Sequence, residues 1–127
     1  MKKIKITALM PMRHKSERIP GKNYKKFSKN GDKLFEVVLK KLIKTNVFNQ
    51  IIINTDSPII KKICKKKYSK VIIHNRPKNL RDGSISMNKI IKHDIVRTSN
   101  EIIFQTHSTN PLIKIDTIIK AVKFYLK

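Results

Sequence analysis

A chain of 127 residues with 39% hydrophobic residues is long enough to bury a core, and this hydrophobic content argues against intrinsic disorder despite a net charge of +22. No apolar run reaches the about 18 residues that a membrane span requires, and the single cysteine, Cys64, excludes an internal disulfide and a zinc site built from cysteines. We therefore expect one domain, residues 1–127, in a reducing cytoplasmic setting with no membrane partner.

Periodicity of apolar residues predicts strands that alternate with helices along the chain. Short continuous apolar runs indicate strands covered on both faces, and apolar spacings of three and four residues indicate amphipathic helices. In chain order, the predicted elements are the strand Lys3–Met10, the helix Asp32–Asn46, the strand Gln50–Thr55, a helix with Pro58 in its first turn, the strand Val71–His74, the helix Ser86–Thr98, the strand Glu101–Gln105 and the helix Ile115–Leu126.

Polar residues at two helix starts are expected to be caps. Asp32, which follows Gly31, is the predicted N-cap of the first helix, and either Asp56 or Ser57 is the predicted cap of the second. For Asp56 we favour this role over that of a metal ligand.

The order of elements predicts an α/β fold with a doubly wound, mainly parallel sheet and helices on both faces. Ligands of such sheets bind in the crevice beyond the carboxyl ends of the strands. Three long polar loops follow strands, namely Arg13–Lys29, Asn75–Ser86 and Thr106–Lys114. These loops should meet at one edge of the sheet, which is where we expect the site.

The first of these loops concentrates positive charge. The stretch RHKSERIPGKN, residues 13 to 23, places Arg13, Arg18 and Lys22 beside the flexible Gly21. Arginine offers a planar fork to phosphate oxygens and lysine a compact charge, so this loop is suited to a polyphosphate. It has neither the Walker P-loop spacing nor the GxGxxG spacing. Judged from composition alone, a solvated lysine-rich loop is an equal alternative.

The high positive charge also raises the question of nucleic-acid binding. Only Arg13, Arg18, Arg76, Arg81 and Arg97 are arginine, and the remaining basic residues are lysines spread along the chain. RNA-binding aromatic motifs, zinc-finger spacings and basic tails are absent from the sequence. The charge therefore predicts weak nonspecific polyanion binding at low salt and no specific nucleic-acid partner.

The order of residues in four blocks resembles a known family. A strand followed by MPMRHKSERIPGKN is similar to the N-terminal signature of the acylneuraminate cytidylyltransferases, the CMP-sialic acid synthetase family. The blocks IIINTDSPII, NRPKNLRDGSISMN and FQTHSTNPL resemble later segments of that family in the same order, the last being longer than its counterpart. The resemblance implies a Rossmann-like nucleotidyltransferase fold.

The resemblance also implies a reaction and its participants. A cytidylyl group would pass from CTP to an acidic sugar of the sialic acid type, a nonulosonic acid, giving a CMP-sugar and pyrophosphate with Mg²⁺ as cofactor. Arg18 is expected to add a phosphate contact to those that the family pattern supplies. The matching positions are Arg13 and Lys22 as catalytic and triphosphate-binding residues, Asn23, Arg76 and Asp82 as nucleotide-binding residues, and Gln105 as a sugar-binding residue.

Several of these assignments have a structural alternative. Lys22 could be a surface lysine, Arg76 could bond the carbonyls of its own loop, and Asp82 could be a turn residue. His14 and His107 are interpreted as polar loop residues, because the sequence gives neither of them a partner.

The chain departs from the family pattern in length and in one loop residue. Glu17 stands where the family has a basic residue, and the family's catalytic domain is longer, so the chain corresponds to its CTP-facing N-terminal part without recognisable metal ligands. We expect an unpaired edge at the fourth strand, covered by a second copy in a homodimer or by a C-terminal segment. Three readings remain: a CMP-sugar-forming enzyme, a noncatalytic nucleotide-binding remnant, and a basic polyanion-binding protein.

Overall fold

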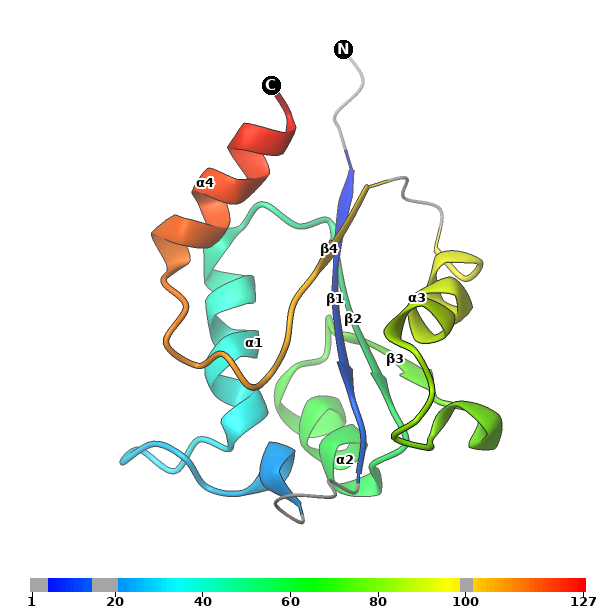
Figure 1. Cartoon of the computed structure of the whole chain (residues 1–127). Coiled ribbons are helices and arrows are strands. Elements are labelled where there is room, and N and C mark those ends of the chain that lie inside the picture. Colours follow the sequence, from blue (N-terminus) through cyan, green and yellow to red (C-terminus); the bar gives the residue numbers. More distant parts are fainter. Residues whose placement is uncertain (1–4, 15–20, 99–101) are drawn as a thin grey trace.

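The computed structural model describes residues 5–14, 21–98 and 102–127, and it shows a parallel sheet flanked by helices (Figure 1). Its strands all run in the same direction, in the order β3-β2-β1-β4. The arrangement confirms the predicted α/β fold. The strands are β1 (Ile6–Met12), β2 (Gln50–Thr55), β3 (Ile72–Asn75) and β4 (Ile102–Gln105).

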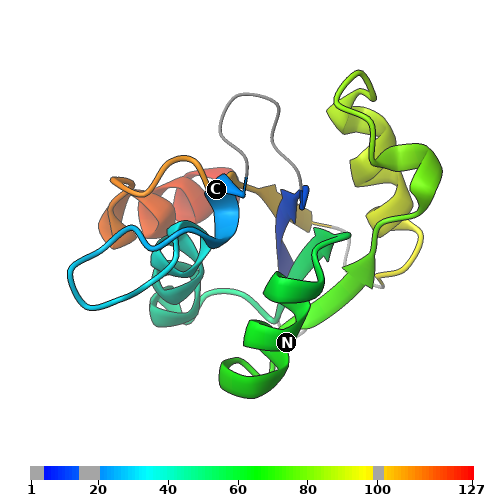
Figure 2. The same ribbon diagram turned by 90° about the horizontal axis from the view of Figure 1, so that it is seen from below.

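Helices lie on both faces of the sheet. Helices α1, α2 and α4 cover one face and share its apolar core, whereas α3 covers the other (Figures 1 and 2). Two short 3-10 helices, η1 and η2, lie in the loops after β1 and β3. The bounds of these elements are α1 (Leu34–Thr45), α2 (Pro58–Lys67), α3 (Met87–Ile95), α4 (Ile115–Tyr125), η1 (Lys22–Tyr24) and η2 (Lys78–Leu80).

Strand β1 continues two residues beyond its predicted end, through Pro11 to Met12. The sequence predicted that the strand ends at Met10, and proline cannot donate to a sheet ladder. In the structure the Leu9 carbonyl accepts a hydrogen bond from Thr106 N at 3.0 Å, on the side of β4. Backbone groups two residues apart in a strand point to the same side, so the nitrogen of Pro11 also points toward β4. However, β4 ends at Gln105, opposite Leu9, and has no residue opposite Pro11. The missing N–H of Pro11 therefore breaks no ladder bond.

The predicted cap of α1 is wrong, whereas one of the two candidates for α2 is confirmed. The carboxylate of Asp32 bonds the Lys40 ammonium at 2.8 and 2.9 Å, and Glu36 Oε1 accepts from Lys33 N at the start of α1. Glu36 can reach back because it sits in the first turn of the helix, as in a capping box. At α2, Ser57 Oγ accepts from the backbone N–H of Ile60 at 3.2 Å.

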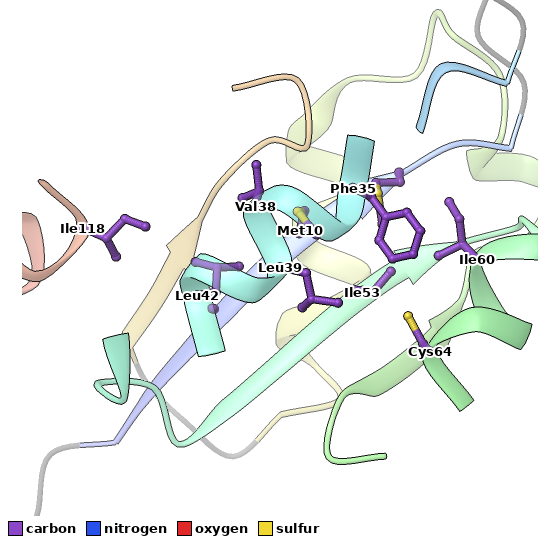
Figure 3. Packing of buried hydrophobic residues seen from close by; sticks show 11 residues of the cluster. Met10, Phe35, Val38, Leu39, Leu42, Ile53, Ile60, Cys64 and Ile118 are labelled. Carbon is purple, nitrogen blue, oxygen red and sulfur yellow. The ribbon is translucent and has the colours of Figure 1, made fainter. Parts of the chain in front are cut away.

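The apolar core lies between the sheet and helices α1, α2 and α4 (Figure 3). Alternate side chains of β1 reach it because successive residues of a strand point to opposite faces. Fully burying one aliphatic or aromatic side chain contributes about 1.5–3 kcal/mol, so this cluster supplies much of the driving force for folding. Its buried members are Ala8, Met10, Met12, Phe35, Val38, Leu39, Leu42, Ile53, Ile60, Cys64 and Ile118.

One end of the molecule is incompletely covered. Among the described strands, β4 pairs only with β1, so its other edge is open. On α4, Ile118 and Val122 are buried, whereas Phe124 and Tyr125 are exposed. The apolar residues of α4 are therefore covered along only part of the helix. Within the described residues, no helix combines the length and the hydropathy that crossing a bilayer would require.

Burial should make the only thiol unreactive. Burial of Cys64 on α2, together with the negative charge of Glu36, raises its pKa to about 12. Thiol reagents attack the thiolate, whose fraction at pH 8 is then about a thousandfold smaller than for an exposed cysteine. We expect DTNB at pH 8 to label the native protein at least ~100-fold more slowly than the urea-unfolded protein. Equal labelling rates would contradict the position of Cys64 in the core.

Candidate functional site

A cleft of about 230 Å³ opens at the carboxyl ends of the strands, where the sequence predicts the site. All three predicted polar loops contribute to its walls, together with the start of α3. The lining residues are Pro11, Met12, Arg13, Lys22, Asn23, Arg76, Asp82, Gly83, Ile85, Met87, Ile90, His107, Ser108 and Thr109.

The structure brings most of the predicted site residues together. Arg13, Lys22, Asn23, Arg76 and Asp82 all line the cleft, although they come from two loops far apart in sequence. Gln105, at the end of β4, is not among the lining residues. Its Nε2 lies 3.3 Å from Nε2 of His107, which does line the cleft. Arg18 lies outside the described residues.

Arg76 is a buried cation at the wall of this cleft. Its side chain is 2% exposed, and in the described chain it forms no ion pair. Burial lowers the pKa of Arg76 and the nearby Arg13 adds to this, while the charges of Asp56 and Asp94 oppose it. A buried charge without a paired counter-charge is costly, so the site favours an anion.

The sequence left open that Arg76 bonds the carbonyls of its own loop, but its hydrogen bonds go to Asn54. Its Nε donates to Asn54 Oδ1 at 2.8 Å and its Nη2 to Asn54 O at 3.3 Å, so both bonds reach across to β2. The loop itself is held by Arg81, whose Nε donates to the Arg76 carbonyl at 2.9 Å. The side chain of Arg76 is thus fixed to the sheet.

Two more cations face the same space from the loop after β1. Arg13 and Lys22 are half-buried, and neither side chain forms a hydrogen bond or an ion pair with another described residue. With Arg76, they place three positive charges around one small volume. Guanidinium and ammonium groups in this arrangement can bind several phosphate oxygens at once.

Asn23 joins two of the loops that form the cleft. Its Nδ2 donates to the carbonyl of Arg13 at 3.2 Å, and its Oδ1 accepts from Ser108 Oγ at 2.5 Å. Asn23 and Ser108 are both buried. The amide thus holds the basic loop against the loop after β4. Ser108 was not identified as a site residue from the sequence.

The two described ends of the basic loop are clamped by an aromatic stack. The rings of His14 and Tyr24 lie 5.1 Å apart at 17°. His14 N also donates to Asp56 Oδ1 at 2.8 Å, and His14 Nδ1 lies 2.9 Å from Ser57 Oγ. The structure therefore gives His14 the partners that the sequence did not reveal. Asp56 holds His14 in place and does not cap α2.

The Tyr24 side of this clamp depends on Gly21. Gly21 has a φ of 68°, in the left-handed region that glycine adopts without strain. A Cβ at this position would lie 2.7 Å from the ring of Tyr24. Only glycine therefore fits beside the stacked ring.

Asp82 is exposed at the rim of the cleft. Hydrogen bonds from the backbone and side chain of Ser84 lower the pKa of Asp82, and the backbone bond measures 2.8 Å. This geometry is that of a turn residue, and the carboxylate still lines the cleft.

The described residues cannot form a complete metal site by themselves, but they could contribute one ligand to a metal ion that is already bound to a polyphosphate. Across residues 5–14, 21–98 and 102–127, no group of three or more His, Cys, Asp or Glu side chains is placed to hold a metal ion. In the described lining of the cleft, Asp82 is the one carboxylate. Mg²⁺ is often held by one or two carboxylates together with substrate phosphates and water. Asp82 would thus serve as the protein's ligand to Mg²⁺ carried by a polyphosphate.

A family comparison agrees with this chemistry. Residues 7–127 match the model of a protein family described as cytidylyltransferase. A search of curated protein sequences finds no match.

Solved structures share the fold at low sequence identity. A CMP:2-keto-3-deoxy-manno-octonic acid synthetase complexed with CTP superimposes with a TM-score of 0.76 at 18% identity, over 94% of this chain and 46% of that chain. A cytidylyltransferase from Leptospira borgpetersenii gives 0.74 at 19%, over 98% and 50%. A 4-diphosphocytidyl-2C-methyl-D-erythritol synthase from Anaerococcus prevotii gives 0.71 at 16%, over 98% and 52%. This chain spans about half the length of these structures.

Two glycine substitutions separate backbone strain from the contact with Tyr24. Gly31 also has a positive φ, 93°, but a Cβ there would meet nothing within 4 Å. We expect Gly31→Ala to cost about 1–2 kcal/mol through backbone strain alone. Gly21→Ala should cost more, because the ring of Tyr24 must also leave its stack on His14. Urea unfolding of both variants measures the difference, and equal losses would show that the stack yields without cost.

Proposed function

Because this chain belongs to the cytidylyltransferase family, we propose that its cleft binds CTP and that the protein transfers the cytidylyl group to an acidic sugar of the sialic acid type. The buried, unpaired guanidinium of Arg76 beside Arg13 and Lys22 carries this proposal. It supplies the positive charge that a triphosphate needs, and no described carboxylate forms an ion pair with it. Such a reaction belongs in the cytoplasm, where CTP is available.

The proposed reaction requires positioning and charge stabilisation more than covalent chemistry from the protein. A hydroxyl oxygen of the sugar forms a bond to the α-phosphorus of CTP and loses its proton to solvent, while the bond from the α-phosphorus to the bridging oxygen breaks and pyrophosphate leaves. Arg13, Lys22 and Arg76 would hold the phosphates in line and stabilise the charge that develops on the leaving group. Arg18, in the same basic loop, would add a phosphate contact. Mg²⁺ would neutralise further phosphate charge when bound.

The acceptor sugar would approach from the end of β4. Gln105 and His107 lie there within 3.3 Å of each other, and His107 belongs to the lining of the cleft. The amide and the imidazole can both hydrogen-bond to sugar hydroxyl or carboxylate groups. We assign the sugar contact to Gln105 on this basis.

A second candidate is CTP binding without turnover by this chain alone. It is favoured by the open edge of β4 and by the exposed apolar residues Leu112 and Phe124, at 84% and 78% exposure. Edges and patches of this kind are usually covered. We propose that a C-terminal segment, or a second copy in a homodimer, covers them and completes the enzyme.

Calorimetry with CTP tests the binding proposal. At physiological salt with Mg²⁺, we expect this protein to prefer CTP over ATP and UTP. Arg13→Ala should weaken CTP binding about tenfold or more, since a hydrogen bond to a charged group is lost. Lys65→Ala removes the same charge from an exposed position on α2 and should leave binding unchanged.

A lack of nucleotide selectivity would contradict the proposal and favour a different function. Weak and equal binding of all three nucleotides, with equal losses in both variants and a steep dependence on salt, would indicate a basic polyanion-binding protein.

A pyrophosphate-release assay tests the need for a covering segment. With CTP, Mg²⁺ and sialic acid, we expect this chain alone to turn over below ~0.1 per second, against about 10 per second for a typical enzyme. The reason is that, among the described residues, the sugar side of the cleft is formed by β4 and the loop that follows it. Turnover near the typical value, dependent on the sugar, would show that the chain needs no further segment.

A further inference from the structure

A cluster of buried polar side chains lies behind the cleft, on the face of the sheet that α3 covers. Asn54 of β2 and Asp94 of α3 are 0% and 2% exposed, and Arg76 contacts Asn54. His74 and His93 complete the cluster, with Nδ1 atoms 2.6 and 3.6 Å from Asp94 Oδ1. Buried polar groups are costly unless they are hydrogen-bonded, so this cluster needs an explanation beyond packing.

The side chain of Asn54 is a two-sided connector within this cluster. Its Nδ2 donates to Asp94 Oδ1 at 2.8 Å, and its Oδ1 accepts from Arg76 Nε, also at 2.8 Å. If the amide were turned over, its NH₂ would face the N–H of Arg76 and its oxygen would face the carboxylate of Asp94. Both contacts would then be repulsive, so the carboxylate selects one orientation of the amide.

That orientation determines which side of the guanidinium faces the cleft. Nε and Nη2 of Arg76 are both held by Asn54, while Nη1 takes no partner in the described part of the chain. Arg76 also lines the cleft. The bonds to Asn54 therefore leave one end of the guanidinium for an anion and prevent the side chain from turning.

We propose that Asn54 is the positioning residue for Arg76 and that Asp94 sets the orientation of its amide, so that Asp94 acts on the anion site from α3 without itself lining the cleft. His74 anchors the carboxylate of Asp94 from β3, and His93 faces it from α3 itself. This inference rests on the proposed role of Arg76 in phosphate binding. It also accounts for an asparagine that directly follows the apolar centre of β2, residues Ile51–Ile53.

The first test follows Arg76 in the protein without ligand. In ¹⁵N NMR spectra the Nε–H signal of Arg76 is identified by its loss in Arg76→Lys, and we expect slow exchange with solvent. Asn54→Leu and Asp94→Leu should each shift this signal and speed its exchange at least ~10-fold, because Nε loses its acceptor or the acceptor loses its orientation. Thr45→Val removes another buried polar group, one that bonds Leu42 O, and should leave the signal unchanged.

A paired exchange of the two side chains guards against simple misfolding. Asn54→Asp alone places two carboxylates against each other and should disturb the Arg76 signal. Combined with Asp94→Asn it restores a donor opposite every acceptor, because an NH₂ group at the position of Asp94 Oδ1 can donate one hydrogen to the new carboxylate and the other to Nδ1 of His74 in its Nε2-protonated tautomer. We expect this double variant to recover the protected Nε–H signal. A signal that survives in folded Asn54→Leu, or that the double variant fails to recover, would overturn the proposal.

The second test measures ligand binding in a double-mutant cycle. By calorimetry with CTP and with inorganic tripolyphosphate, Asn54→Leu should weaken binding about tenfold in the native background. In the Arg76→Lys background it should cost less than ~2-fold, because the residue it positions is gone. Additive losses would show that Asn54 acts on the ligand site by another route. If the native protein fails to select CTP, the proposed function fails, while the NMR result still decides the positioning role.

Discussion

Strand β1 pairs in parallel with β2 on one side and with β4 on the other, and the register of these two ladders builds the site. Met12 lies opposite Thr55, so the basic loop leaves β1 beside the start of α2, where Asp56 and Ser57 hold His14. Leu9 lies opposite Gln105, so β4 ends earlier than β1. The loop after β4 therefore has the space to cross the end of the sheet and bring Ser108 to Asn23. Shifting either ladder by one residue would turn the side chains of the shifted strand to the opposite face of the sheet and displace the loop that follows it.

The same edge concentrates three cations that form no ion pair with a described carboxylate. Arg13 and Lys22 come from a loop, and Arg76 is held by the sheet, so the three cations differ in how firmly they are placed. A fixed guanidinium loses little freedom when a ligand binds, whereas a loop lysine must be ordered. The cleft thus combines one preorganised contact with more adaptable ones. An anion in this cleft would reduce the repulsion among the cations and stabilise the folded chain through linkage.

Apolar periodicity was sufficient to predict the sheet, the helices and the edge at which the loops meet. Ends of elements were less predictable, as Pro11 shows, because its compatibility with β1 depends on where a neighbouring strand ends. The family resemblance singled out Arg13, Lys22 and Arg76, and the structure places all three at one cleft. Neither approach found the contact between Asn54 and Asp94, which lie 40 positions apart and meet only when α3 packs on β2. Polar pairs of this kind produce no regular spacing of residues that could be recognised in the sequence.

The stack of His14 on Tyr24 has a spectroscopic consequence. The chain contains three tyrosines and no tryptophan, so its near-ultraviolet emission comes from tyrosine alone. Tyr125 is exposed to water, and the hydroxyl of Tyr68 is bound to the carboxylate of Glu36 at 2.6 Å. Tyr24 is the third tyrosine, and its ring stacks on the imidazole of His14 at the mouth of the basic loop. The molecule therefore carries a native optical reporter beside its cleft, one that needs no label.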